Sequence, residues 1–245
     1  WPDAASALLR DPDRRGEAEA FLDSVRERMR PFPKISEGPD LTRMGADVPR
    51  IAHKAAAQLV GPERPQYNPL YVWSAESDVP VRLLAAAGRS FAAEHPGARM
   101  AVTSVSEFSE DFIRALGDGV AGAWRERWWT VDLLLVHGAE MLSETERAQD
   151  EFFHLFEALK RRGSRVLMAA DRPPAEIESI DERLRSRFEG GLVLEITGGV
   201  GETEAVELTE PEPEVGAESS WDDVTRNAQV EAPIEELPEV EFPPL

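Results

Sequence analysis

The sequence predicts an α/β domain in which helices cover both faces of a parallel sheet of about five strands. Five short apolar runs have the length and composition of buried strands. Helical stretches separate consecutive runs, which is typical of a doubly wound sheet with right-handed crossovers. With 245 residues, of which 42% are hydrophobic, the chain is long enough to bury the core of one such domain.

Residues 1–49 are expected to form an N-terminal helical segment followed by a linker. One amphipathic helix, over about residues 16–30, carries Phe21, Leu22, Val25 and Met29 on its apolar side. Pro31 ends it, because proline cannot continue a helix. Two interpretations of this helix stay open. It packs on a core, its own or that of a domain upstream, or it is dedicated to binding a partner.

Residues 50–197 are expected to form the core. The predicted strands are Leu70–Trp73, Met100–Thr103, Val131–Val136, Arg165–Ala170 and Leu192–Ile196. The predicted helices cover about residues 50–60, 79–94, 104–117, 120–129 and 143–162, with a further short helix before the last strand. Ser104 and Glu107 have the spacing of a capping box, in which each side chain bonds the other residue's backbone N–H. They therefore mark the start of the third helix.

Residues 198–245 are expected to form an acidic tail, rich in Pro and Glu, without stable structure. The net charge of the chain is −20, and the stretch from Gly201 to Leu245 holds 14 acidic residues and one arginine. Such a composition buries too little apolar surface to offset the entropy of ordering the chain. Two apolar islands, around Trp221 and at Val240–Leu245, suggest short docking motifs. A tail that only keeps the protein soluble is the alternative.

The composition excludes several classes of protein. The chain has no cysteine and only four histidines, which are scattered, so we expect neither a disulfide nor a metal site. No apolar run reaches the length of about 18 residues that a membrane span requires. These features fit a cytoplasmic protein.

The stretch from Asp171 to Gly191 is the most informative part of the sequence. Its turn Asp171–Pro174, which reads Asp-Arg-Pro-Pro, and its string Leu184–Phe188, which reads Leu-Arg-Ser-Arg-Phe, resemble the bacterial replication initiator DnaA. The similarity extends from about Arg50 to Ile196. The resemblance implies a three-layer P-loop core of the AAA+ ATPase type. The helical lid that follows this core in the family is replaced here by the acidic tail.

The residues that bind the nucleotide in this family are replaced. The family's phosphate-binding loop corresponds to Ser74, Ala75, Glu76, Ser77, Asp78, Val79, Pro80 and Val81. This loop has no glycine, Pro80 stands where the family has lysine, and Val81 has no hydroxyl for Mg²⁺. His137 and Gly138 replace the two Walker B acids, and Ala169–Ala170 replace the polar sensor. We therefore expect a pseudo-ATPase without cofactor or metal.

The same resemblance implies that Arg187 is an arginine finger, the residue that reaches into a neighbouring subunit's ATP site. Arg183 and Arg185 precede it on the same short helix. Because residues two apart on a helix point to different sides, the three arginines cannot share one face. Pairing of all three with carboxylates at their own surface, from Glu178, Asp181 and Glu182, is the alternative.

Three functional hypotheses follow. The first is a catalytically inactive DnaA-like adaptor or regulator in replication initiation, with an active DnaA-type ATPase or another replication protein as partner. The second is a protein that binds single-stranded nucleic acid, with Trp124, Trp128 and Trp129 stacking on bases and Arg125 and Arg127 contacting phosphates. Burial of these side chains in the core is the competing interpretation of that stretch. The third, an ATPase with an unorthodox loop, requires four lost parts of the site to be compensated.

Overall fold

The computed structural model describes residues 15–35, 37–144 and 146–197. The predicted acidic tail lies outside the described residues, as does the start of the N-terminal segment. The elements are β1 (Leu70–Trp73), β2 (Met100–Ser104), β3 (Leu133–His137), β4 (Arg165–Ala170), β5 (Leu192–Glu195), α2 (Arg15–Met29), α3 (Arg50–Val60), α4 (Val79–Glu94), α5 (Val105–Gly117), α6 (Ala121–Trp128), α7 (Glu146–Arg162) and α8 (Glu182–Glu189). Short 3₁₀ turns lie at Leu41–Arg43, Ala139–Glu144 and Pro174–Glu176.

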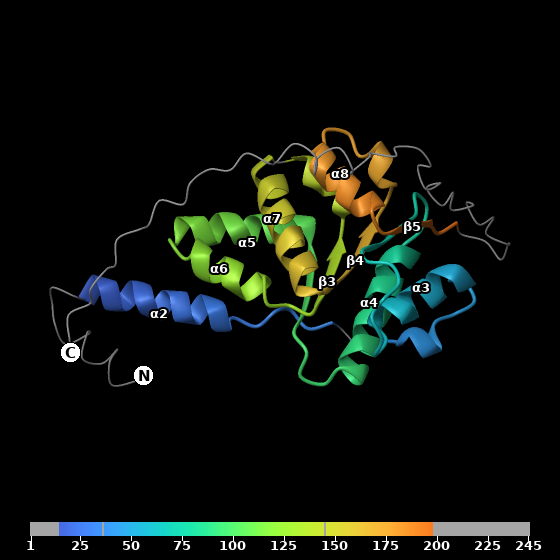
Figure 1. The fold of residues 1–245 in the computed structure, drawn as a ribbon, viewed down its shortest axis with the longest axis horizontal. Helices are drawn as coiled ribbons and strands as arrows, with labels where there is room; N and C mark the ends of the chain where they lie inside the picture. Colours follow the sequence, from blue (N-terminus) through green and yellow to red (C-terminus); the bar gives the residue numbers. More distant parts are fainter. Residues whose placement is uncertain (1–14, 36, 145, 198–245) are drawn as a thin grey trace, which may run out of the picture. The chain divides into compact units, whose positions relative to one another are not determined.

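The strands form one parallel sheet in the order β2-β3-β4-β1-β5. Helices α5, α6, α7 and α8 lie on one face of the sheet, and α3 and α4 lie on the other (Figure 1). Alternate residues of β3 serve the two faces. Leu134 and Val136 join the core under α5–α8, while Leu133 and Leu135 join the core under α3 and α4. The predicted three-layer α/β fold is confirmed.

The sequence-based boundaries agree with the structure to within two residues at most ends. The capping box at the start of α5 is present: Glu107 N donates to Ser104 Oγ at 3.1 Å, and Ser104 N donates to Glu107 Oε2 at 2.9 Å. A local backbone signal of this kind is readable from sequence because its partners are three residues apart.

Helix α2 lies along α6 (Figure 1), and charged side chains join it to the core. The prediction for its apolar side was wrong for Phe21 and Met29, which are 42% and 77% exposed, while Leu22 and Val25 are partly buried. Instead, Arg127 of α6 lies 3.0 Å from Glu27 of α2, and Arg30, just after α2, reaches Asp111 of α5. The described part of the predicted N-terminal segment therefore packs on the core.

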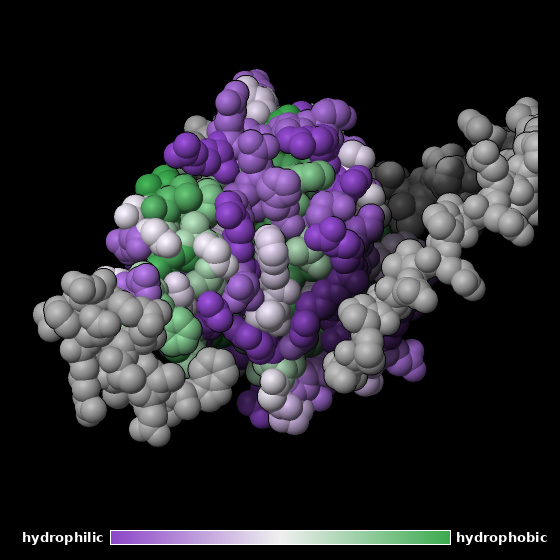
Figure 2. Space-filling view, turned by 60° about the vertical axis from the view of Figure 1, so that its left-hand side comes forward, coloured by the Kyte–Doolittle hydropathy of each residue, from purple (hydrophilic) through white to green (hydrophobic). Residues whose placement is uncertain are grey.

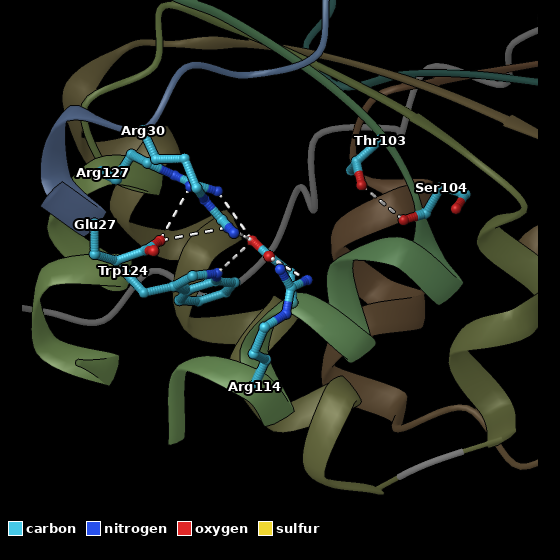
Figure 3. A network of polar contacts seen from close by, with 8 residues as sticks. Glu27, Arg30, Thr103, Ser104, Arg114, Trp124 and Arg127 are labelled. Atoms are coloured by element: carbon cyan, nitrogen blue, oxygen red, sulfur yellow. Dashed lines mark hydrogen bonds and ion pairs between the residues drawn. The ribbon is translucent and has the colours of Figure 1, made fainter. Parts of the chain in front are cut away.

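Asp111 is the centre of this charged cluster, and Figure 3 shows its partners Arg30, Arg114, Trp124 and Arg127 converging. Its carboxylate accepts hydrogen bonds from Trp124 Nε1 at 2.8 Å, from Arg127 Nη2 at 3.0 Å, from Arg114 Nη2 at 2.9 Å and from Arg30. Burial raises the pKa of Asp111. The bonds from Arg30 and Trp124, with the charges of the arginines, outweigh burial and hold that pKa below its usual value.

One face of the molecule is mostly hydrophilic. On the face shown in Figure 2, hydrophilic side chains predominate and apolar groups reach the surface between them. The large apolar side chains with the greatest exposure include Met29, Ile113 and Val81. Within the described ranges, no helix is long and apolar enough to cross a bilayer.

Candidate functional site

The predicted remnants of the nucleotide site meet at the carboxyl ends of β1, β4 and β3. The residues after β1 lead directly into α4, and Ser74 N donates to Ala170 O at 3.2 Å. His137 pairs in register with Ala169, and Trp73 pairs with Ala170. The fold thus brings together the loop after β1, the Walker B position and the sensor position, as the resemblance implies.

The loop after β1 does not fit a phosphate. Val79 is 5% exposed and Pro80, also buried, has no N–H to offer at the start of α4. Ser77 Oγ donates to Ser74 Oγ at 3.1 Å, so the loop's hydroxyls bond each other. Asp78 lies at the N-terminus of α4, the end of a helix that attracts anions. Its carboxylate makes no hydrogen bond to the N–H groups of that end, but its negative charge opposes the binding of a phosphate there.

Arg82, in the first turns of α4, is already paired with two carboxylates. Arg82 lies 3.2 Å from Asp78, and it also forms an ion pair with Asp47 from the segment before α3. The hydrogen bond from Arg82 holds the pKa of Asp47 below its usual value. An incoming phosphate would have to displace two carboxylates from one guanidinium.

The Walker B position offers no metal ligand set. β3 ends at His137, and Gly138, with φ of 72°, turns the chain so that its N–H donates to Ala169 O at 2.9 Å. The next acid, Glu140, accepts a bond of 3.3 Å from the backbone N–H of Asp171. Across the part of the chain that the structure describes, no group of three or more His, Asp or Glu side chains is arranged to hold a metal. These residues do not fit a magnesium-bound nucleotide.

Helix α8 is a rigid platform for its arginines. Leu184 and Phe188 are fully buried, and Phe188 stacks on Tyr71 of β1 with ring centroids 6.0 Å apart. Buried Gln149 of α7 accepts from Asp181 N at 2.5 Å and donates to Ser179 O at 3.1 Å. These bonds fix the turn before α8 against α7.

The three arginines of α8 bind different groups, which agrees with their predicted divergence. Arg183 bonds Asp181 and Asp150, with its Nη2 at 2.6 and 3.1 Å from the two carboxylates. Arg185 donates to Pro174 O and Ile177 O at 2.6 and 3.1 Å, and to Glu182. Arg187 donates through Nε to Glu157 Oε1 at 2.6 Å.

The partner of Arg187 was not predicted. Glu157 lies on α7, thirty residues away, whereas Glu178 had been considered as a surface partner of the arginines. The hydrogen bond from Arg187 holds the pKa of Glu157 below its usual value. Phe153 of α7 is partly buried, and the guanidinium of Arg183 lies over its ring, 4.7 Å from the ring centroid. Because Phe152 and Phe153 are consecutive on a helix, they cannot both face the core.

The prediction of stacking surfaces around α6 is wrong for Trp124 and Trp128, while Trp129 is 38% exposed. Trp124 and Trp128 are 0% and 2% exposed and pack on Phe108, with ring centroids 5.2 Å apart in each case. Arg127 is 3% exposed and Arg125 bonds Glu151, with Nη2 at 2.6 Å from Oε2. Bases cannot stack on rings that the core already covers.

Comparisons with known proteins agree with this fold. The family model described as the bacterial DnaA ATPase domain matches residues 44–195. The chain is 36% identical over 147 residues to the chromosomal replication initiator protein DnaA of Corynebacterium aurimucosum, covering 60% of this chain. It spans only 27% of the length of that relative.

Two solved structures of DnaA proteins are similar to this chain. A DnaA bound to AMPPCP and single-stranded DNA has a TM-score of 0.63 and 30% identity, over 67% of this chain and 51% of that one. Domain III of the Thermotoga maritima DnaA has a TM-score of 0.62 and 24% identity, over 67% of this chain and 69% of that one. The second likeness concerns the fold alone.

Proposed function

This chain belongs to the bacterial DnaA ATPase-domain family, and we propose that it is a member that neither binds nor hydrolyses ATP and acts by associating with another replication protein. The observation that carries this proposal is the loop from Ser74 to Val81. The N-terminus of α4 lacks one N–H at Pro80, and the negative charge of Asp78 beside it opposes the binding of a phosphate. The absence of acids at His137 and Gly138 supports the same conclusion.

Thermal unfolding with Mg-ATP tests the first half of the proposal. A ligand at 100 times its dissociation constant stabilises a protein by about 2.7 kcal/mol. We expect no shift of the unfolding temperature at millimolar Mg-ATP, while an active DnaA-type ATPase domain, run as the positive control, should shift upwards. A clear upward shift of this protein would refute the proposal.

The partner proposed is an active DnaA-type ATPase from the same organism. In the family the arginine finger acts on the next subunit's ATP, so a subunit can lose its own site and still supply a finger. Arg187 is suited to this role because its planar fork stays charged and matches phosphate oxygens. Such a subunit would occupy one end of an ATP-bearing assembly and either cap it or stimulate hydrolysis.

Mixing the two proteins tests the second half. We expect co-migration in the presence of ATP and a change in the partner's ATP turnover that Arg187→Ala abolishes. Arg183→Ala is the control, because Arg183 is bonded to two carboxylates on its own surface. If Arg187→Ala and the parent protein behave alike in both measurements, the finger role is wrong.

A further inference from the structure

The three arginines of α8 differ in how many of their nitrogens are already engaged. Arg185 uses all three nitrogens, and two of its bonds go to backbone carbonyls of the turn before α8. Arg183 uses Nε and Nη2 on Asp181 and Asp150. Arg187 uses Nε alone, and its Nη1 and Nη2 have no hydrogen-bond partner among the described residues. Of these three arginines, Arg187 alone keeps both terminal nitrogens, Nη1 and Nη2, available to a ligand.

Two side chains of α7 hold Arg187 in place. Its Nε lies 2.6 Å from Glu157 Oε1, and its guanidinium lies 5.9 Å from the ring centroid of Phe153. Both partners belong to α7, which packs on α8 through Phe156 and Phe188 in the core. The side chains of Arg187 and Glu157 are 35% and 30% exposed, so the ion pair is partly buried and partly accessible to solvent.

We propose that Glu157 is a positioning residue, which holds Arg187 by Nε so that Nη1 and Nη2 are presented to phosphate oxygens of a nucleotide bound by a neighbouring subunit. The proposal rests on the proposed function, in which Arg187 reaches such a nucleotide. A guanidinium binds phosphate best with two parallel N–H groups, and the edge formed by Nη1 and Nη2 supplies them. Glu157 occupies the one nitrogen that this geometry does not need.

Holding the side chain in advance matters because arginine is flexible. Ordering a free side chain of this kind at an interface costs a factor of about two to ten in binding or rate. The pair adds little to the stability of the fold, since a half-exposed ion pair contributes about 0–1 kcal/mol. Removing Glu157 should therefore leave the protein folded and change only the orientation of Arg187.

The test uses the full chain together with the active DnaA-type ATPase and follows the partner's ATP turnover as this protein is titrated in. Glu157→Ala is expected to lower the maximal stimulation about two- to tenfold, with co-migration unchanged. Glu157→Gln keeps an oxygen acceptor and should restore most of the effect. Glu182→Ala is the matched control. Glu182, whose side chain is 82% exposed, is the carboxylate partner of Arg185 on the same helix.

A second measurement needs no partner. In nitrogen-15 NMR of the protein alone, the Nε–H of Arg187 should exchange with water faster in Glu157→Ala than in the parent protein or in Glu182→Ala. The two proposals fail in different ways. If Arg187→Ala has no effect on turnover, the finger role itself is wrong. If Arg187→Ala abolishes stimulation while Glu157→Ala matches the parent in turnover and exchange, only the positioning role is wrong.

Discussion

Replacing Asp111 by alanine is expected to destabilise the domain by about 3 kcal/mol. Asp111 is 13% exposed and accepts bonds from Arg127, which is 3% exposed, and from Trp124, which is fully buried. Removing one partner of a buried ion pair typically costs about 3–5 kcal/mol, because the remaining charge stays in a medium of low dielectric. The carboxylate of Glu27, 3.0 Å from Arg127, remains as a partial substitute. The lower end of that range is therefore expected.

Urea unfolding followed by far-ultraviolet circular dichroism measures this loss. The midpoint should fall by about 1.5 M for a urea dependence of about 2 kcal/mol per M. For a domain of this size the unfolding temperature should fall by about 6–12 °C. Limited trypsin digestion should also cut α2 at Arg26 or Arg28 earlier than in the parent protein, because Asp111 anchors Arg30 at the end of that helix.

Arg114→Ala is the matched control, since Arg114 bonds the same carboxylate but is 59% exposed. An exposed pair contributes about 0–1 kcal/mol, so this variant should unfold almost like the parent protein. If Asp111→Ala loses no more stability than Arg114→Ala, the buried cluster does not hold α2, and the reasoning is wrong.

Three further predictions concern stability. Gly191→Ala should cost about 3 kcal/mol in urea unfolding, because its Cβ would lie 1.9 Å from Pro69 O, whereas Gly190→Ala, with the nearest atom at 3.1 Å, should cost far less; equal losses would contradict this. Phe188→Ala should cost about 3–5 kcal/mol by the same measurement, because the ring is fully buried, and a loss below about 1 kcal/mol would refute its role in the core. The folded pKa of Asp111 lies below the ordinary 3.8, so its contribution is complete above about pH 4 and is lost as the pH falls through the folded pKa; Asp111→Ala should therefore lose less stability on acidification than the parent protein.

Features that depend on neighbours in the chain could be predicted from the sequence. The five strands could be predicted because each is a short apolar run. β3, for example, pairs with a strand on each side and is buried on both faces, so nearly all of its residues must be apolar. The capping box of Ser104 and Glu107 involves residues three apart, so its spacing is visible without a structure. The DnaA resemblance was readable for a similar reason, since the string Leu184–Phe188 is continuous in sequence.

The candidate site was predictable only in part. The loss of glycine and lysine in the loop from Ser74 to Val81 is a statement about residue types, which sequence displays directly. The pairing of Arg82 with Asp47 and of Arg187 with Glu157 joins residues about thirty positions apart. Neither pair has a local pattern, because long side chains meet wherever the packing of helices brings them.

The sequence by itself determined the order of the elements, the sheet and the replaced nucleotide residues of this protein. The tertiary structure decided which side chains are available to a partner. Trp124 and Trp128 look like stacking residues beside two arginines, but their rings are buried against Phe108 of α5. Arg183 and Arg187 look alike in sequence, yet only Arg187 keeps two nitrogens without a partner among the described residues. Burial and bonding of this kind arise from contacts between distant segments, so local pattern does not report them.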